Sequence, residues 1–201
     1  MTESRISPIS YLSFNMKKRC PWVKESNELY VKYHDTEWGV PVRDDKTIFE
    51  FLVLESAQAG LSWETVLNKR ENYRKAFAGF NPVKVSKFKG SDVQKLIKNA
   101  VIIRNRLKIE SAINNAKRFL EVKKEFGTFS KYIWGFVGGK TIKNRIKTIK
   151  DYRATSPESD ALAKDMKKRG FKFLGSTVLY AHMQATGMVN DHSADCFKNK
   201  K

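Results

Sequence analysis

The stretch IFEFLVLESAQAGLSW, residues 48–63, carries an apolar helical pattern into a break at Gly60. On the helical repeat of about 3.6 residues, Glu55 falls beside Phe51 and Ala59, on the apolar side of the predicted helix. An isolated charge there is costly unless it is paired or faces a cavity. Glu55 is therefore either half of a buried ion pair or a functional group, and the pattern leaves both alternatives open.

The helical pattern continues through most of the chain, and no run of alternating apolar and polar residues predicts a strand. Capping residues mark helix starts, as Ser62 does before Trp63 and Ser156 before Pro157. The predicted helices cover residues 27–34, 45–59, 62–78, 92–98, 103–125, 129–136, 157–169 and 176–187. We expect a basic loop over residues 137–157 and an all-α fold.

The charge balance predicts a polyanionic partner. The 201 residues include 39 Lys and Arg against 21 Asp and Glu, a net charge of +18, and the basic residues are spread along the chain. Such a spread favours a folded basic face for nucleic acid over a disordered tail, although a merely well-solvated basic protein is the alternative. An apolar content of 41% is enough for one core.

The ends of the chain and its longest uncharged stretch bear on where the protein works. Residues 1–15 lack the apolar core of a targeting signal. The patterned sequence begins after Met16, so we expect residues 1–15 to be a disordered extension, or the product of an upstream start, before a single helical domain, residues 16–201. Residues 173–190 are free of charge but include Gly, Ser, Thr, His and Gln, which indicates a buried helix instead of a membrane span. We expect a soluble, cytoplasmic monomer with no membrane partner.

The stretch KKRGFKFLGST, residues 167–177, joins two predicted helices through a turn with glycine at both ends. Gly170 suits a left-handed helix terminus, and Gly175 before Ser176 suits a tight start to the next helix. Backbone N–H groups at such a helix start bind anions, and Lys172 adds charge, so a DNA phosphate is the natural ligand of this helix–hairpin–helix. Glycine-bounded turns are common, however, and the turn alone is a weak signal.

Two cysteines and two of the three histidines lie near the chain ends. Cys20 is followed by His34, and His192 precedes Cys196 with a spacing that puts both side chains on one face. Two thiolates and two imidazoles make a tetrahedral, structural zinc site, which would join the N- and C-terminal segments. Coincidence is the alternative for so few residues. His182 is interpreted as a core or pocket-lining residue.

Five aromatic residues accompany Glu55 in the first third of the chain: Trp22, Tyr30, Tyr33, Trp38 and Trp63. Each taken singly is most simply a core residue. Together with a carboxylate they describe a site for a planar, electron-poor ring, since aromatic faces attract cationic heterocycles and the carboxylate supplies the opposite charge.

Three segments carry a resemblance to a known family. YHDTEWGVPV (33–42), LESAQAGLSWETVLNKRENYRKAF (54–77) and GFKFLGSTVLYAHMQATGMVNDH (170–192), with Cys196, resemble DNA-3-methyladenine glycosylase I, and the similarity covers about residues 18–197. The resemblance implies a helix–hairpin–helix DNA glycosylase fold with structural zinc between its termini. It also implies a base-excision repair enzyme that releases 3-methyladenine from alkylated double-stranded DNA, and we predict a monofunctional one without strand cleavage.

The resemblance also implies roles for individual residues. The family's zinc ligands match Cys20, His34, His192 and Cys196. Its pocket carboxylate matches Glu55, its base-stacking tryptophan Trp63, and its other aromatic pocket positions Trp22, Tyr30, Tyr33 and Trp38. The pair pressed into the gap left by an extruded nucleotide matches Gly60 and Leu61. The contacts of the hairpin with DNA are predicted from the turn itself and fall on Gly170, Lys172, Gly175 and Ser176.

Several alternatives stay open at this point. Glu55 could bind the base, stabilise an oxocarbenium-like sugar or position water. Lys172 is predicted to contact DNA and not to form a Schiff base. The hairpin lacks the LPGVG sequence and the downstream catalytic aspartate of the wider helix–hairpin–helix glycosylases, though Asp191 lies near the position where such an aspartate would fall. Rival hypotheses are a non-catalytic, zinc-stabilised DNA-binding module and a glycosylase for 7-methylguanine or hypoxanthine.

Overall fold

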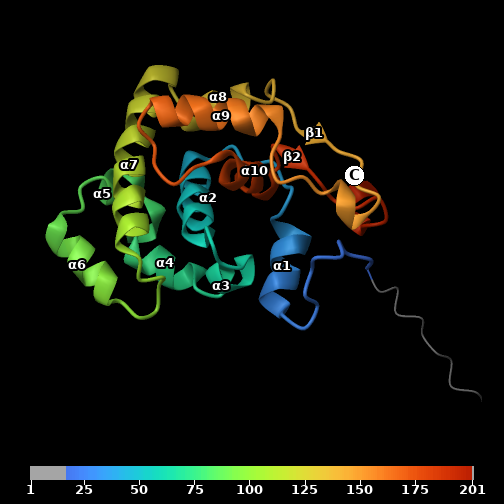
Figure 1. Cartoon of the computed structure of the whole chain (residues 1–201), viewed down its shortest axis with the longest axis horizontal. Helices are drawn as coiled ribbons and strands as arrows, with labels where there is room; N and C mark the ends of the chain where they lie inside the picture. The colour runs from blue at the N-terminus through green and yellow to red at the C-terminus, as the bar shows by residue number, and fades with distance from the viewer. Residues whose placement is uncertain (1–16, 201) are drawn as a thin grey trace, which may run out of the picture.

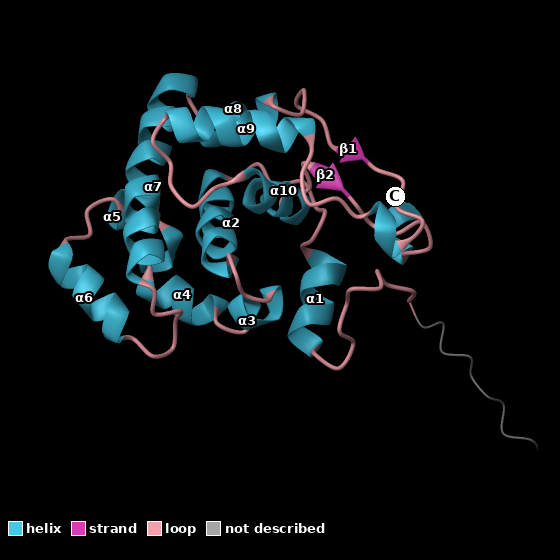
Figure 2. Cartoon of the chain, in the orientation of Figure 1, coloured by secondary structure: helices cyan, strands magenta, loops and turns pink. Residues whose placement is uncertain are grey.

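The computed structural model describes residues 17–200, so the predicted extension over residues 1–15 lies outside the described residues. The described chain is mostly helical, as predicted (Figures 1 and 2). Its α-helices are α1 (Glu28–Thr36), α2 (Asp45–Gln58), α3 (Trp63–Leu67), α4 (Arg70–Ala76), α5 (Pro82–Val85), α6 (Gly90–Lys98), α7 (Arg106–Phe126), α8 (Phe129–Gly135), α9 (Pro157–Lys168) and α10 (Ser176–Ala185). Short 3₁₀ helices follow as η1 (Ala78–Phe80), η2 (Ile149–Asp151) and η3 (Phe197–Lys200), and two strands as β1 (Ile142–Lys143) and β2 (Val189–Asn190).

Helix α2 is the centre of the molecule. Asp44 caps its start by accepting a hydrogen bond from the Thr47 backbone N–H at 2.8 Å. Residues 48–57 are then buried without interruption, which is the pattern of a helix covered on all sides. In Figure 1 it stands between α7 and α10, and both pack against it.

The predicted helix over residues 62–78 is wrong, because this segment forms two helices that meet at Asn68 and Lys69. The two helices, α3 and α4, contact different parts of the fold. Glu64 of α3 accepts hydrogen bonds from Asn27, at 2.9 Å, and from Lys24, before the start of α1. Arg70 of α4 reaches α2 instead. Other boundaries shift by a few residues, as at α7, which begins at Arg106 because Asn105 caps it.

The segment predicted as a loop, residues 137–157, contains β1 and η2. Strand β1 pairs in parallel with β2, with Ile142 opposite Val189 and Lys143 opposite Asn190. Two-residue strands are too short to show an alternating pattern, which explains why the sequence did not reveal them. This pairing fastens residues 142–146 alongside the C-terminal segment.

Two apolar cores meet at the side chain of Trp63. The larger core surrounds α2 and α7, and the smaller one includes Cys20, Tyr33, Trp38 and Cys196 near both ends of the described chain. The ends are joined directly, since the Phe197 N–H donates to the Lys18 carbonyl at 2.9 Å. The seam between the two cores is where a cavity opens.

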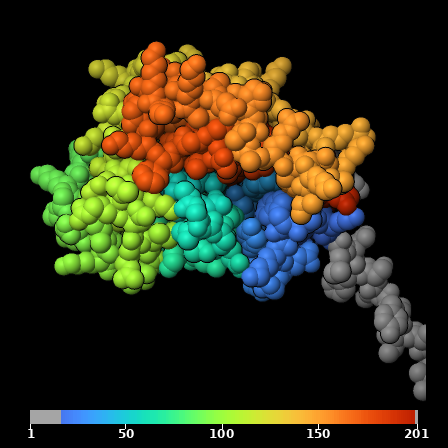
Figure 3. All heavy atoms as spheres, in the orientation of Figure 1, coloured from blue at the N-terminus to red at the C-terminus, as the bar shows by residue number. Residues whose placement is uncertain are grey.

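Helices α9 and α10 are joined by a tight turn on the face shown in Figure 3. Gly170 (φ 84°) and Phe173 (φ 57°) take left-handed conformations in it. Asn115 of α7 holds the turn, accepting from the Lys172 N–H and donating to the Lys172 carbonyl, each at 2.8 Å. Among the described residues, no helix combines the length and apolar character needed to cross a bilayer.

Candidate active site

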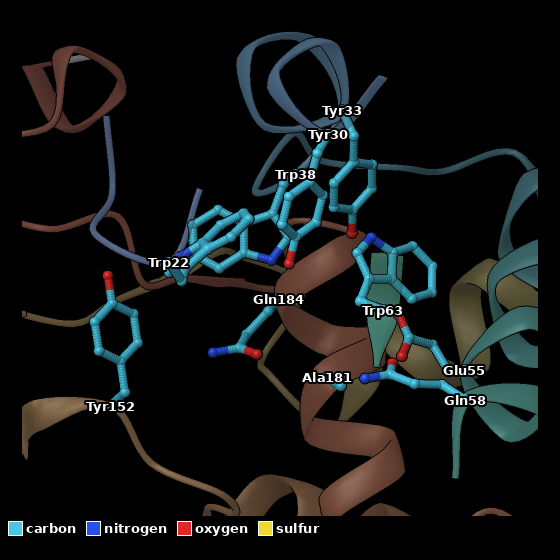
Figure 4. A pocket seen from close by; sticks show the side chains of 10 residues that line it. All are labelled: Trp22, Tyr30, Tyr33, Trp38, Glu55, Gln58, Trp63, Tyr152, Ala181 and Gln184. Carbon is cyan, nitrogen blue, oxygen red and sulfur yellow. The ribbon is translucent and has the colours of Figure 1, made fainter. Parts of the chain in front are cut away.

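A cavity of 180 Å³ opens at the seam between the two cores (Figure 4). It brings together Glu55 and all five aromatic residues singled out in the sequence. Its lining residues are Trp22, Tyr30, Tyr33, Trp38, Glu55, Gln58, Trp63, Tyr152, Ala181 and Gln184. They come from α1, α2, α3, α10 and the segments beside them, so the cavity exists only in the folded chain.

The aromatic rings form two walls. Trp22 packs edge-on against Trp38, with centroids 4.7 Å apart, and also contacts Tyr30. Tyr33 lies 5.2 Å from Trp63, whose ring is nearly parallel to that of Phe51 at 6.5 Å. Tyr33 and Trp38 are buried, whereas Trp22, Tyr30 and Trp63 are half-buried and keep part of their rings available. Such walls suit a flat, electron-poor ring.

Glu55 is only 4% exposed, and no hydrogen bond or ion pair to its carboxyl group is found among residues 17–200. Burial without a partner raises its pKa to about 8. The buried ion pair, one of the two alternatives for this residue, is therefore not present in the described structure. Figure 4 draws the carboxyl group beside Trp63, at the floor of the cavity.

A neighbouring polar group of the cavity also lacks a hydrogen-bond partner. The indole N–H of Trp63 is buried without a hydrogen-bond partner among the described residues. Burial, and secondarily the charge of Glu55, raises the pKa of Tyr33 well above its usual value, so its hydroxyl stays neutral. A buried wall with spare hydrogen-bonding capacity is typical of a binding or catalytic site.

A second cavity of 170 Å³ adjoins the first and shares Glu55, Gln58 and Ala181 with it. Its remaining wall is made by Gly60 and Leu61 on one side and by Thr177 and Val178 of α10 on the other, together with Ala59. Gly60 has a φ of 80°, and the Leu61 side chain after it is 41% exposed. In Figure 3 the cyan surface of the α2–α3 region meets the orange surface of the α9–α10 region on this face.

The predicted hairpin residues directly precede, in the sequence, the α10 residues that line this second cavity. Gly175 is the N-cap of α10 and has no side chain to bond the first N–H groups of the helix. The Ser176 hydroxyl is hydrogen-bonded to that of Ser159, at 2.7 Å, and Lys172 is exposed. In the same first turn of α10, Thr177 and Val178 line the second cavity together with Gly60 and Leu61. The loop and the hairpin therefore open on one side of the molecule.

Three of the four predicted metal ligands meet beside the pocket. The ligand atoms of Cys20, His34 and Cys196 all lie within 4.8 Å of one another, and all three residues are buried. The Cys196 sulfur is 3.5 Å from His34 Nε2, close to the roughly 3.6 Å expected between S and N ligands of one tetrahedral zinc ion. His192 is outside this group, although its ring centroid is 5.3 Å from that of His34.

The surroundings of both histidines fit a metal. His34 Nδ1 is hydrogen-bonded to Asp35 at 2.8 Å, and His192 Nδ1 to Asn190 at 2.8 Å. Each arrangement leaves Nε2 as the ring nitrogen available to a metal. His34 Nε2 lies 3.5 Å from both the Cys20 backbone N–H nitrogen and the Cys196 sulfur, and His192 Nε2 is buried without a partner among the described residues. Burial lowers the pKa of His192 to about 3, so its ring is neutral and able to act as a ligand.

Four lining residues were missed at the sequence level as members of the site: Gln58, Tyr152, Ala181 and Gln184. Tyr152 comes from the stretch predicted as a loop and had no local signal. Gln184 did have one, since it is a polar residue in the uncharged stretch 173–190 and follows Ala181 by one helical turn. His182, by contrast, is fully buried, as the core interpretation expected.

Comparisons with known proteins agree with this geometry. Residues 22–199 match the family model described as methyladenine glycosylase. DNA-3-methyladenine glycosylase 1 of Escherichia coli (strain K12) is 47% identical over 89% of this chain and 95% of its own. A crystal structure of 3-methyladenine DNA glycosylase I superposes with a TM-score of 0.87 at 46% identity, over 90% of this chain and 98% of that one. A variant of such an enzyme in complex with 3-methyladenine gives 0.85 at 36% identity, over 87% and 94%.

Proposed function

The chain belongs to the methyladenine glycosylase family, and we propose that it releases 3-methyladenine from alkylated double-stranded DNA by hydrolysing the N-glycosidic bond. The observation that carries the proposal is the unpaired, buried Glu55 on the floor of an aromatic cavity. Its relatives bear this activity in their names, and one is solved with 3-methyladenine bound. The reaction belongs to base excision repair.

The chemistry of the lesion explains what the pocket has to do. Methylation at N3 leaves adenine positively charged in DNA, so the glycosidic bond is already weakened and the base departs neutral. Little acid catalysis is required. The enzyme must extrude the nucleotide, hold the cationic base and favour rupture of the bond. The ring of Trp63 supplies a face for the base, with Tyr33 and the Trp22–Trp38 wall enclosing it.

Glu55 gives the pocket its selectivity in this proposal. In the empty cavity the high pKa, about 8, keeps the carboxyl group largely neutral at physiological pH. A cationic base next to it favours the ionised carboxylate, so binding the lesion and ionising Glu55 support each other. Normal adenine, which is uncharged, gains no such attraction. The carboxylate is then placed to accept a hydrogen bond or stabilise the developing sugar cation.

The two cavities suggest how the extruded nucleotide divides between them. The first receives the base and the second, beyond Glu55, receives the sugar. Leu61, exposed at the edge of the second cavity, fills the gap in the duplex, and Gly60 provides the turn that presents it. Lys108 supports this loop, because its ammonium donates to the carbonyls of Ala57, at 2.8 Å, and Ala59, at 2.5 Å.

The α9–α10 turn is the proposed helix–hairpin–helix contact with the DNA backbone. The first N–H groups of α10 lack a side-chain cap at Gly175, and Gly170 and Lys172 shape and charge the approach. The net charge of +18 adds non-specific attraction to DNA. No lysine lines either cavity among the described residues, which supports a monofunctional enzyme without a Schiff-base step. We retain the expectation of a cytoplasmic monomer.

The cysteine and histidine cluster is proposed to hold structural zinc, with Cys20, His34, His192 and Cys196 as ligands. Zinc there would fasten the two chain ends that frame Trp22 and Trp38. Cys196→Ala is expected to lower the melting temperature by about 10 °C or more, while turnover per folded molecule changes much less. Metal analysis of the purified protein is the direct readout. A stable but inactive variant would contradict the structural role.

Chromatography of free bases released from methylated duplex DNA tests the function. The expected result is a 3-methyladenine peak, with 7-methylguanine absent. Release of both bases would refute the narrow pocket. No release from folded protein would favour the non-catalytic DNA-binding module. Glu55→Gln should lower release while leaving binding to abasic DNA intact, and the exposed Glu110→Gln serves as the matched control.

A further inference from the structure

The cavity has a polar group opposite Glu55 that the proposed chemistry does not yet use. Gln184, on the C-terminal turn of α10, lines the pocket beside Ala181. We propose that Gln184 determines which purine the pocket accepts, by presenting its carbonyl oxygen to the exocyclic amine of an adenine, and that Asp191 is the positioning residue that fixes this orientation. The inference rests on the proposed function and deepens it.

The orientation of the Gln184 amide follows from its partner. Gln184 Nε2 donates to Asp191 Oδ2 at 2.7 Å. An ionised carboxylate only accepts hydrogen bonds, so the amide nitrogen has to face Asp191 and the oxygen has to face the other way. No hydrogen bond to Gln184 Oε1 is found among residues 17–200. Figure 4 draws this oxygen on the side nearer Ala181 and the nitrogen on the side nearer Tyr152.

Asp191 is itself held rigidly. It is fully buried and accepts three hydrogen bonds: from Gln184, from the Tyr180 hydroxyl at 2.8 Å, and from Asn144 Nδ2 at 2.7 Å. It does not line either of the two cavities, so it has no path to a sugar or to an attacking water. Its position suits a residue that acts through Gln184 and not a catalytic aspartate.

The small parallel sheet explains how these groups meet. Asn144 follows β1 and Asp191 follows β2, and the Asn144 N–H donates to the Asn190 carbonyl at 3.1 Å. Pairing of the strands therefore places the Asn144 amide beside Asp191. The backbone of Gln184 is fixed as well, because its carbonyl accepts from the Gly39 N–H at 3.0 Å. The backbone carbonyl of Gln184 and the amide nitrogen of its side chain are thus both hydrogen-bonded to the surrounding fold.

The chemistry of purines gives this arrangement a meaning. Adenine carries an amine at position 6, a hydrogen-bond donor, where guanine carries a carbonyl oxygen, an acceptor. A fixed carbonyl oxygen pairs with the amine and leaves two acceptors facing each other when guanine enters. A buried polar group left unpaired is disfavoured, and this discriminates between ligands of nearly equal size. The rim of aromatic rings cannot make this distinction, since stacking tolerates either base.

The competitor is 3-methylguanine, which has the same N3 methyl group and the same positive charge in DNA. It carries a carbonyl oxygen at position 6 and an additional amine at position 2, so the effect of each variant is read as a change from the wild-type ratio. Both bases are released from one sample of methylated DNA, and the ratio of their initial rates cancels differences in enzyme concentration and folding. We expect the wild-type protein to favour 3-methyladenine. Gln184→Leu should reduce the ratio about tenfold, because the acceptor is lost. Asp191→Asn should reduce it at least as far, since its amide can donate to Gln184 Oε1 and turn the Gln184 amide around.

Two further variants separate reading of the base from structural damage. The double variant with both substitutions should show no further fall in the ratio, as expected when Asp191 acts through Gln184. Tyr180→Phe removes a different donor from Asp191 and should leave the ratio within about twofold of wild type. An unchanged ratio in Gln184→Leu, or an equal loss of both bases, would overturn the proposal.

Binding of the free bases gives a second readout that does not depend on catalysis. Titration of free 3-methyladenine and 3-methylguanine, followed by tryptophan fluorescence, should show the same preference in wild type and its loss in Gln184→Leu. If wild-type protein releases neither base from DNA, the proposed function fails. The titration then still decides the role of Gln184, and it does so too if Asp191→Asn does not fold.

Discussion

Helix α2 carries two buried carboxylates five residues apart, Glu50 and Glu55, and the protein surrounds them in opposite ways. They are 6% and 4% exposed. Glu50 Oε1 accepts from Arg70 Nε at 2.6 Å and from Arg74 at 2.7 Å. Glu55 has no such partner among the described residues, and burial raises its pKa to about 8.

The difference separates a structural charge, Glu50, from the charge proposed to be functional, Glu55. Glu50, with its arginines, ties α4 to α2, and Arg70 extends the tie to Glu37 at 2.6 Å. A buried ion needs an opposite charge and hydrogen bonds to be stable, and the arginines supply both to Glu50. At Glu55 neither is met within the protein, so the group keeps its capacity for a ligand. Burial alone does not single out a candidate for the proposed active site, whereas burial without a partner at a cavity does.

The largest expected effect is at Glu50. Glu50→Ala leaves Arg70 buried, only 13% exposed, and without its main partner. We expect the free energy of unfolding to fall by about 3–5 kcal/mol, the usual result of breaking a buried pair. Urea denaturation measures this, with Glu110→Ala on the exposed face of α7 as control. Base release per folded molecule should change little, and a specific loss of activity at full stability would erase the distinction between the two glutamates.

The second prediction concerns pH and compares wild type with Glu55→Gln. The pKa of Glu55 is higher in the folded state, about 8, than in the unfolded chain, so the folded protein holds the extra proton. The contribution of Glu55 to stability is thus complete below its unfolded pKa and is lost as pH rises through the folded one. Between pH 5 and 8 the wild-type protein should lose stability relative to Glu55→Gln, by at most about 1.4 kcal/mol per pH unit.

Urea denaturation of both proteins across this pH range checks the slope. The difference between them cancels every other titrating group. A constant difference from pH 5 to 8 would mean that Glu55 is ionised in the empty pocket, and the selectivity argued from its neutral state would fail.

The third prediction is catalytic. Glu55→Gln keeps the size of the side chain but cannot become negative beside a cationic base. A hydrogen bond to a charged group contributes about 1.5–3 kcal/mol, so the rate constant for 3-methyladenine release should fall roughly tenfold to a hundredfold. Single-turnover release from methylated DNA measures it. A rate equal to wild type would assign the selectivity to the aromatic walls alone.

The sequence foretold the Glu55 side of this comparison better than the Glu50 side. An unbalanced charge in an apolar helix raised the question of a pocket at once, and the family resemblance, which the comparisons confirm, named the aromatic residues around it. Glu50 has no comparable signal in the sequence, because its partners Arg70 and Arg74 lie 20 and 24 residues away. Ion pairing of that kind is a product of packing and has no local signature.

The same limit explains the other differences. The mostly helical fold followed from the periodic pattern, but the break between α3 and α4 depends on contacts of Glu64 with Asn27 and of Arg70 with Glu50. The role proposed for Gln184 depends on Asp191, whose place is set by two strands of two residues. Neither the two strands nor the segment that brings Tyr152 to the cavity has a hydrophobic pattern long enough to be detected in the sequence. These features could not be predicted from the sequence, because each depends on contacts between residues far apart in the chain.

The smallest expected effect lies at the edge of the Glu50 cluster. Arg74 is 38% exposed, so water already screens its interactions with Glu50 and with Glu71. Arg74→Met keeps most of the apolar stem over α4 and leaves Glu50 with Arg70. We therefore expect a loss of no more than about 1 kcal/mol in urea denaturation, as for other exposed pairs. Arg70→Met should cost clearly more, because it strips Glu50 and Glu37 of a buried partner. Equal losses would mean that the two arginines share the charge of Glu50 evenly and that exposure does not grade their contributions.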